Sequence, residues 1–411
     1  MRPVACVVLG MVSAAVPVWA QDMSQQRAWC VNKDNAFRAD QSIGGCTALI
    51  QAGRETSQTL AIVYNNRGNG HASKGEYDGA IDDYSQAVRL NPTYAEAFNN
   101  RGVAYDGKGQ YDRALQDYDQ AVRLNPEVAV VYYSRGNAYR LLGQYDRAIR
   151  DYDQAIRLDP NDAVTFNNRG IAYRLKGQYD RALQDYDQAI RLAPTYALAF
   201  NNRGVAYEGK GQYDRAIRDY DQAIRLKPDD AEAFNNRGSA YRAKGQYDRA
   251  IEDYDEAIRL KPNYAAAFNS RGFTYDAKGQ YGRAIQDYDE ALRLSPKDGG
   301  MLNNRCYARA SAGSLAEALA DCNEALRLMP GHAETLDSRG FTYLKMRQSP
   351  QAIADYDAVL KVDPKQAAAL FGRGVARLQV GDASGGNADI AAAMALDGTI
   401  GERLARRGVV R

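Results

Sequence analysis

The stretch that decides the fold is AEAFNNRGVAYDGKGQYDRALQDYDQAVRLNPEV, which spans residues 95–128. The same pattern of 34 residues begins again, with small changes, at residues 61, 129, 163, 197, 231, 265, 299, 333 and 367. A fixed period of this length is typical of stacked repeats, in which each unit packs mainly on its neighbours. We number the positions of each unit 1 to 34.

Each unit is predicted to form two helices. Positions 1–14 carry Phe98, Arg101, Gly102 and Tyr105 at a spacing that places them on one helical face. A glycine at position 15 follows as a helix stop, because glycine adopts a left-handed backbone without steric cost. Positions 18–31 form the second helix, which Pro126 ends because proline cannot continue the hydrogen-bond ladder.

The packing between the two helices is also written into the unit. Small residues at positions 8, 20 and 27 allow a close approach, and aromatic residues at positions 4, 11, 17 and 24 fill the surrounding space. In these features the unit resembles the tetratricopeptide repeat, over residues 61–397. The resemblance implies an all-α fold, a right-handed superhelical solenoid of stacked antiparallel helix pairs with about ten units plus end caps. It also implies a concave face made by the first helix of each unit.

The N-terminal residues have the pattern of an export signal. Arg2 precedes an apolar run over residues 4–18, and small residues precede a predicted cleavage site after Ala20. The alternative is a buried N-terminal helix. With a signal peptide at residues 1–20 and no later anchor, we expect an exported bacterial protein that is periplasmic or secreted. The net charge of +2 implies no field for nucleic acid or a membrane surface, so we expect no nucleic-acid binding and no membrane insertion.

Four cysteines would remain after cleavage, and they form two pairs with equal spacing. Cys306 and Cys322 occupy positions 8 and 24 of their unit, on the facing sides of its two helices, and Cys30 and Cys46 stand in the same relation. We therefore predict two disulfides, Cys30–Cys46 and Cys306–Cys322, each worth roughly 3 kcal/mol in the chain-entropy description. Four buried free thiols are the alternative. A metal site is not predicted, because the spacing is not that of a zinc motif.

The cysteine register also predicts the domain organisation. Residues 21–60 are interpreted as a degenerate N-terminal capping repeat, with a short insertion near residues 55–60, and residues 61–400 as ten tandem units. Residues 401–411 keep Leu404, Arg407 and Gly408 at positions 4, 7 and 8, which predicts a C-terminal capping helix. Such caps are needed because a regular unit would expose an apolar face at each end of the stack.

Two charged residues recur in every regular unit: an arginine at position 7 and an aspartate at position 23. Position 7 lies on the packed face, where an unpaired guanidinium would be costly. We predict structural ion pairs among these residues, for example between Arg101 and Asp117 and between Arg169 and Asp185. The pairs form either within a unit or with the unit before. The alternative is that the arginines bind a ligand.

The resemblance implies that positions 2, 5, 6, 9, 12 and 13 line a groove for a partner. Position 5 is asparagine in seven units, and position 6 is asparagine in six. A ladder of such amides can donate to and accept from the backbone of an extended peptide. Aromatic residues at position 9 add predicted anchors for apolar side chains. The predicted groove residues are Asn65, Asn99, Asn167, Asn201, Asn235, Asn269, Asn303, Phe273, Tyr307 and Phe341. The alternative for one of the two asparagine columns is that it only bridges adjacent helices.

No motif in the sequence assembles a nucleophile with a base, and we predict neither an enzyme nor a cofactor. The D-Y-D runs, such as residues 185–187, lack the loop and the distal glutamate of a calcium site. Our first hypothesis is a non-enzymatic protein–protein interaction scaffold of the cell envelope that binds extended peptides or partner proteins. The alternative is a structural, self-assembling homo-oligomer of repeats. The sequence identifies neither the partner nor the process.

Overall fold

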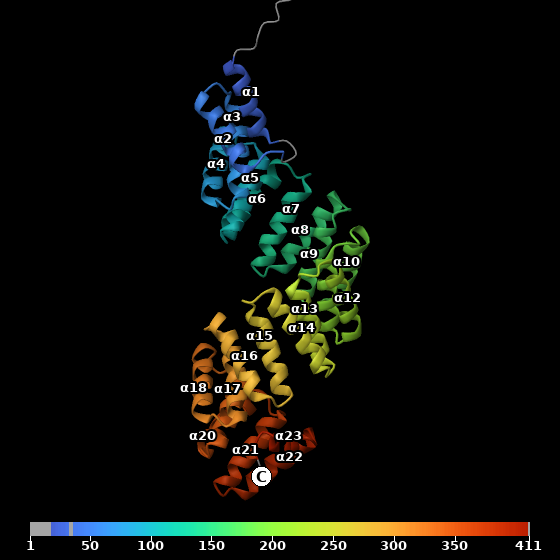
Figure 1. Cartoon of the computed structure of the whole chain (residues 1–411), viewed down its shortest axis with the longest axis vertical. Helices are drawn as coiled ribbons and strands as arrows, with labels where there is room; N and C mark the ends of the chain where they lie inside the picture. Colours follow the sequence, from blue (N-terminus) through green and yellow to red (C-terminus); the bar gives the residue numbers. More distant parts are fainter. Residues whose placement is uncertain (1–17, 33–35, 410–411) are drawn as a thin grey trace, which may run out of the picture. The chain divides into compact units, whose positions relative to one another are not determined.

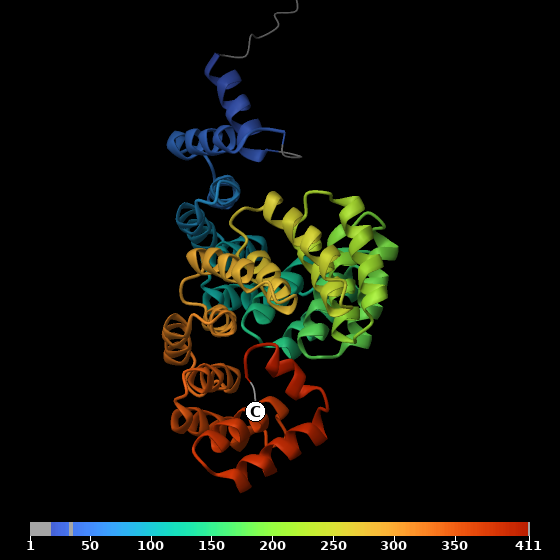
Figure 2. The same ribbon diagram turned by 60° about the horizontal axis from the view of Figure 1, so that its bottom comes forward.

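A computed structural model describes residues 18–32 and 36–409 (Figure 1). All regular secondary structure in these residues is helical, and consecutive helices pack as antiparallel pairs, which confirms the predicted all-α repeat fold. The chain divides into an N-terminal subdomain, Met1–Pro194, and a C-terminal subdomain, Thr195–Arg411. Figure 2 shows the helix pairs of both subdomains from a second direction.

The described residues of the N-terminal subdomain form five helix pairs. The helices are α1 (Val18–Val31), α2 (Ala39–Ala52), α3 (Ser57–Ser73), α4 (Tyr77–Leu90), α5 (Ala95–Gly107), α6 (Tyr111–Leu124), α7 (Ala129–Leu141), α8 (Tyr145–Leu158), α9 (Ala163–Leu175) and α10 (Tyr179–Leu192).

The described residues of the C-terminal subdomain form six further pairs and a short final helix. The helices are α11 (Ala197–Gly209), α12 (Tyr213–Leu226), α13 (Ala231–Ala243), α14 (Tyr247–Leu260), α15 (Ala265–Ala277), α16 (Tyr281–Leu294), α17 (Gly299–Ala312), α18 (Leu315–Leu328), α19 (Ala333–Lys345), α20 (Ser349–Val362), α21 (Ala367–Gln379), α22 (Ala383–Leu396) and α23 (Ile400–Ala405).

The helix ends follow from glycine and proline. After α5, Gly109 has a φ of 70°, the left-handed conformation predicted for position 15. The second helix occupies positions 17–30, one residue earlier than predicted at each end. The reason at its end is that Asn125 precedes Pro126 and is extended, with φ −136° and ψ 90°, because a residue before proline is forced out of the helical region.

In eight of the ten regular units the core is a contact between a glycine at position 8 and a tyrosine at position 24. A Cβ atom built on Gly102 would lie 2.7 Å from Cε1 of Tyr118, so only glycine lets the two helices approach this closely. Tyr118 is fully buried, as are the alanines at positions 20 and 27, Ala114 and Ala121. The predicted set of small packing residues is therefore correct.

In two units a disulfide takes the place of this glycine–tyrosine contact. The structure joins Cys30 to Cys46 with an S–S distance of 2.10 Å, linking α1 to α2. It joins Cys306 to Cys322 at 2.00 Å, linking α17 to α18. All four cysteines are buried, so the bridges lie in the interior of their helix pairs.

The first helix of the first regular unit begins earlier than predicted. Residues 57–60, expected as part of an insertion, form an additional first turn of α3, and the Thr56 hydroxyl caps this turn by accepting from the Thr59 N–H at 3.2 Å. The predicted signal peptide lies outside the described residues except for residues 18–20, which begin α1. Among the described helices, none combines the length and the apolar composition that crossing a membrane requires.

Candidate functional site

The inner face of each stack is made by the first helices of successive pairs. In the N-terminal subdomain α3, α5, α7 and α9 contact one another in order, and in the C-terminal subdomain α11, α13, α15, α17, α19 and α21 do so. Among the described residues, the second helices of successive pairs make no comparable contacts. In a curved stack the helices on the inner side are closer together, so the first helices form the concave surface. We call this surface the groove.

Arginine–aspartate pairs hold each unit together beneath the groove. Arg101 donates to Asp117 from Nε at 2.8 Å and from Nη2 at 2.7 Å, and Arg169 donates to Asp185 at 2.9 and 2.6 Å. Both pairs lie within a unit, between positions 7 and 23. The hydrogen bonds to Asp117 raise the pKa of Arg101. Bidentate pairs of this kind are directional as well as strong, so they fix how the two helices meet.

In most regular units a second aspartate links the arginine to the preceding unit. Arg135 Nη1 donates at 2.8 Å to Asp119, which occupies position 25 of the unit before, and Arg169 Nη1 donates at 2.6 Å to Asp153 in the same way. The D-Y-D run therefore has a packing role at each of its residues. Its first aspartate binds the arginine of its own unit, its tyrosine packs on glycine, and its second aspartate binds the arginine of the next unit.

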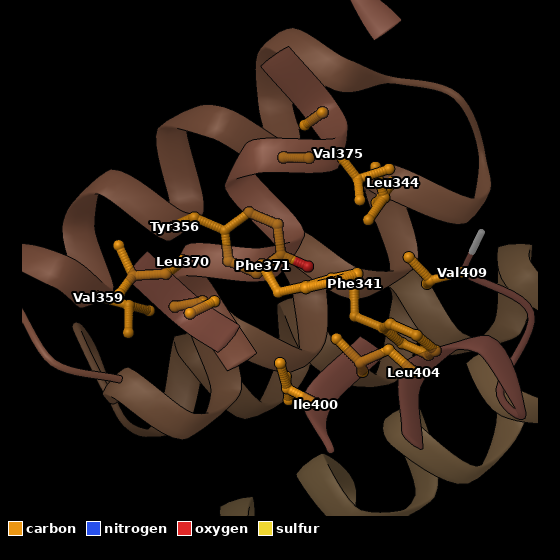
Figure 3. Packing of buried hydrophobic residues seen from close by; sticks show 14 of the residues in the cluster. Phe341, Leu344, Tyr356, Val359, Leu370, Phe371, Val375, Ile400, Leu404 and Val409 are labelled. Atoms are coloured by element: carbon orange, nitrogen blue, oxygen red, sulfur yellow. The ribbon is translucent and has the colours of Figure 1, made fainter. Parts of the chain in front are cut away.

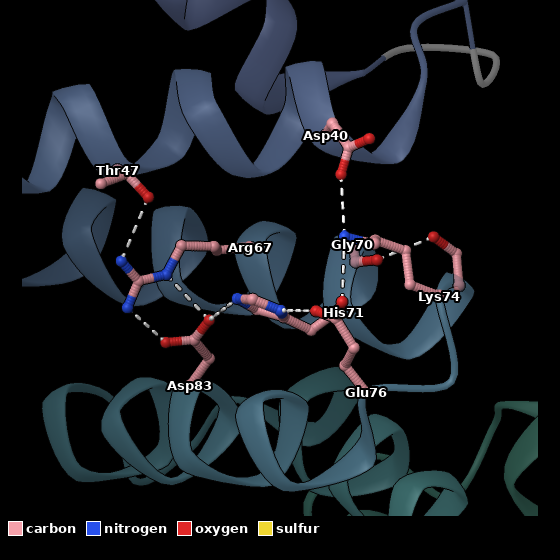
Figure 4. A network of polar contacts seen from close by, with 9 residues as sticks. Asp40, Thr47, Arg67, Gly70, His71, Lys74, Glu76 and Asp83 are labelled. Carbon is pink, nitrogen blue, oxygen red and sulfur yellow. Dashed lines mark hydrogen bonds and ion pairs between the residues drawn. The ribbon is translucent and has the colours of Figure 1, made fainter.

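The first regular unit shows a variant of this network (Figure 4). Arg67 pairs with Asp83 at 2.6 Å and reaches back to the Thr47 hydroxyl of α2 at 3.3 Å. His71, at a position where most units have tyrosine, lies with Nδ1 2.7 Å from Glu76 and Nε2 3.8 Å from Asp83. This histidine therefore lies between two carboxylates at the join between α3 and α4.

The asparagines of the groove bond one another across units. Asn100 at position 6 donates to Asn65 at position 5 of the preceding unit at 3.1 Å, and Asn236 donates to Asn201 at the same distance. Asn304 donates to Asn269 at 3.1 Å. Position 5 is the more buried column, and Asn65, Asn167 and Asn201 are at most 1% exposed. The position-6 amides other than Asn202 are half-buried and lie nearer to solvent.

The asparagine ladder has gaps that follow one rule. The buried Oδ1 atoms of Asn99, Asn235 and Asn303 accept no hydrogen bond. In each case the next unit has serine at position 6, where Asn100, Asn236 and Asn304 stand in the complete rungs. A serine hydroxyl is too short to replace the amide, so each gap leaves an unpaired acceptor just beneath the groove.

Large apolar side chains are exposed at groove positions of the first helices. They occur at positions 2, 9 and 13. In the N-terminal subdomain they are 39–53% exposed, and they are Ile62, Val103, Val130, Leu141, Val164 and Leu175. Position 9 was predicted as a groove column from the aromatic residues, but the apolar character of positions 2 and 13 was missed. The signal was present in the sequence, because apolar residues stand at these positions in several aligned units.

The three predicted aromatic anchors lie in different environments. Phe273 is 44% exposed, and the Arg242 guanidinium stacks over its ring at 4.8 Å. Tyr307 is half-buried, with its ring centroid 5.1 Å from that of Phe341. Phe341 is only 3% exposed, because residues after α22 cover it.

Acidic residues at position 12 complete the groove. Asp106 accepts from the buried Tyr118 hydroxyl at 2.9 Å, and Glu208 accepts from Tyr220 at 3.0 Å. Burial raises the pKa of Asp106 to about 6, although the tyrosine hydrogen bond acts in the opposite direction. Within the residues that the structure describes, no group of histidine, cysteine and acidic side chains is arranged to hold a metal ion.

Comparisons with solved structures give the same architecture. The chain is 14% identical to a chain of the APC/C hetero-tetramer Cut9–Hcn1, with a TM-score of 0.54 over 95% of this chain and 88% of that chain. It is 21% identical to a tetratricopeptide repeat protein from Parabacteroides merdae, with a TM-score of 0.52 over 61% and 98%. It is also 26% identical to YrrB, described as a TPR protein with an unusual peptide-binding site, with a TM-score of 0.38 over 47% and 99%. A search of curated proteins found no match.

Family models match the chain along most of its length. Models described as tetratricopeptide repeat match residues 201–265 and 339–393, residues 95–128, 129–162 and 265–298, and residues 151–184. A model described as TPR repeat matches residues 68–109 and 172–211. Proteins with this fold are typically non-catalytic scaffolds for protein–protein interaction. Together with the helix pairs and their 34-residue spacing, these matches show that the chain belongs to the tetratricopeptide repeat family.

Proposed function

We propose that this chain is a non-enzymatic scaffold whose groove binds extended peptide segments of partner proteins. The observation that carries the proposal is the set of exposed apolar side chains at positions 2, 9 and 13, beside the asparagine ladder. Val130 and Leu141, both on α7, are 53% and 52% exposed. Burying apolar surface contributes roughly 25 cal/mol per Å², so a partner that covers these side chains gains affinity from them.

The chemistry of the groove favours an extended ligand with apolar side chains. The position-6 amides can donate to and accept from a peptide backbone, which is independent of the ligand's sequence. The apolar columns can receive side chains that alternate along an extended strand. Position 12 carries both acids and arginines, such as Asp106 and Arg140, so a ligand of one charge sign is not favoured.

The proposal includes the compartment. The signal-like residues 1–20 and the two internal disulfides support a periplasmic or secreted scaffold, because disulfides persist in oxidising compartments. The self-assembling alternative predicts that copies of the chain stack end to end or pack as a homo-oligomer. Light scattering separates the two, since a concentration-independent monomer contradicts self-assembly.

Selection of displayed random decapeptides tests peptide binding directly. We expect the full chain to select peptides with alternating apolar residues, and the double substitution Val130→Glu with Leu141→Glu to abolish their binding while the melting curve is unchanged. The control is Gln116→Glu, at an exposed position on the outer helix α6, which we expect to bind as the parent does. Binding that survives the groove substitutions, or a failure to select any peptide, refutes the proposal.

A further inference from the structure

The residues that follow α22 return to the groove of the C-terminal subdomain. Ile400, Leu404 and Val409 are at most 7% exposed and pack with Phe341 and other buried residues of the same cluster (Figure 3). We call residues 400–409 the return segment. It covers Phe341 and contacts Tyr307, which are two of the three aromatic residues that the sequence predicted to be open for a ligand, and it leaves Phe273 exposed.

The backbone of the return segment is held by a groove side chain. Lys345, at position 13 of its unit, donates from Nζ to the Arg407 carbonyl at 3.0 Å and to the Ala310 carbonyl at 2.7 Å. This lysine therefore ties the return segment to α17 and α19. A backbone carbonyl that accepts from a groove side chain is the kind of contact that an extended peptide ligand would make.

The Arg407 side chain enters a pocket made of groove residues. Its Nη2 lies 3.0 Å from Asp276 Oδ2, and its Nη1 lies 3.3 Å from Asp276 Oδ1 and 3.1 Å from the Ser311 hydroxyl. The guanidinium carbon lies 4.6 Å from the centre of the Tyr307 ring and 5.6 Å from that of Tyr281. The Arg407 and Asp276 side chains are only 17% and 12% exposed.

The pocket differs from the equivalent places in other units. The carboxylates of Asp106 and Glu208, also at position 12, accept from a core tyrosine of their own unit. Asp276 instead accepts from a guanidinium that lies 131 residues further along the chain. At the groove positions the pocket offers one carboxylate, one hydroxyl and one aromatic face, which together match the planar fork of arginine and not the ammonium of lysine.

We propose that Asp276, Tyr281, Tyr307 and Ser311 form a subsite for an arginine side chain of a bound peptide, and that Arg407 occupies this subsite in the free protein. The proposal rests on the proposed function of the groove and adds the chemistry of one ligand residue. The return segment is then an intramolecular competitor, and a partner binds only when the segment leaves. If the segment is docked in nine of ten molecules, the apparent Kd of a partner rises about tenfold, because only the open fraction binds.

Fluorescence anisotropy with the full chain tests the subsite. The probe is a labelled undecapeptide of alanine, serine and valine with one central arginine, and the matched peptide has citrulline, which keeps the shape and lacks the charge. We expect Arg407→Gln to bind the arginine peptide at least about fivefold more tightly than the parent chain does, because the subsite is then vacant. Adding Asp276→Asn should remove the difference between the two peptides.

Two further variants keep the test sharp. Arg406→Gln removes a neighbouring arginine whose side chain is 78% exposed, and it should behave as the parent does. Arg407→Lys keeps the positive charge without the fork, and it should give an intermediate gain. If Arg407→Gln does not fold by circular dichroism, the lysine variant supplies the comparison.

The outcomes separate this inference from the proposed function. Equal binding of the arginine and citrulline peptides to Arg407→Gln overturns the subsite, even where both peptides bind and the groove function stands. Binding of the arginine peptide that is no tighter in Arg407→Gln than in the parent overturns the competition. A failure of both peptides to bind any variant overturns the subsite together with the peptide-binding function.

Discussion

Replacing Asp117 with asparagine tests whether the repeated ion pairs hold the units together. Asp117 is a buried carboxylate that accepts two hydrogen bonds from Arg101, at 2.8 and 2.7 Å. The remaining nitrogen of Arg101 donates to the Ser85 hydroxyl at 3.2 Å, because the preceding unit has serine where others have aspartate. The substitution therefore leaves this guanidinium without a carboxylate among these partners.

The structure supplies a matched comparison in the next unit. Arg135 also pairs with a buried aspartate, Asp151, but it donates in addition to Asp119 at 2.8 Å. Breaking a buried pair on one side costs about 3–5 kcal/mol, and we expect Asp117→Asn to lie near about 3 kcal/mol because Arg101 is partly exposed and asparagine keeps one acceptor oxygen. Asp151→Asn should cost only about 1–2 kcal/mol, because Arg135 keeps a carboxylate partner.

Native-state hydrogen exchange is the appropriate measurement, since a repeat array does not have to unfold in one step. We expect the amides of α5 and α6 to lose more protection in Asp117→Asn than those of α7 and α8 lose in Asp151→Asn. The control is Asp78→Asn, which removes an ion pair whose aspartate is 85% exposed and should cost less than about 0.5 kcal/mol. Equal losses in the two buried-pair variants, or no loss in either, would refute a structural role for the pairs.

Three further predictions follow from the same contacts. Ser270→Asn should stabilise the C-terminal subdomain by about 1 kcal/mol in thermal unfolding, because the added amide can donate to the unpaired Oδ1 of Asn235. Asp106 is raised in pKa to about 6 in the folded state, so its contribution to stability is present below its ordinary pKa and is lost as the pH rises through about 6. Asp106→Asn should therefore raise the free energy of unfolding at pH 7 by about 1–2 kcal/mol, a value reduced for partial solvation, and should flatten the loss of stability between pH 4 and 6. Reduction should add four hydrogens to the mass of the unfolded chain, and loss of the Cys306–Cys322 bridge by double alanine substitution should cost about 3 kcal/mol.

The fold was predictable because its determinants recur. Gly102 and Tyr118 each stand in a column of the same residue, and the 34-residue register alone places them opposite each other. The ion pairs were predictable as a class, since an arginine on a packed face needs a partner. Whether the partner came from the same unit or the one before was not, because both geometries satisfy the spacing. The structure shows that Arg135 uses both, through two different aspartates.

The groove was less predictable, because its residues depend on contacts between units. The sequence placed asparagine at positions 5 and 6, but a repeat read in isolation does not show that Asn100 reaches back to Asn65. Nor does it show that Asn99 is left without a donor by a serine one unit later. The contact between Arg407 and Asp276 has no local signal at all, because it depends on a turn of the chain after α22.

These observations divide the repeat into two sets of positions with different constraints. At positions 7, 23 and 25, the arginine binds one aspartate of its own unit and, in most units, one aspartate of the unit before, so a change of the arginine disturbs both contacts. Positions 2, 9, 12 and 13 face the groove, and their residues differ from unit to unit, for example Val103, Phe273 and Tyr307 at position 9. Such variation is tolerated because the arginine–aspartate pairs do not include these positions. The near-identity of the units thus specifies the scaffold, and under the proposed function ligand selectivity resides in the few positions where the units disagree.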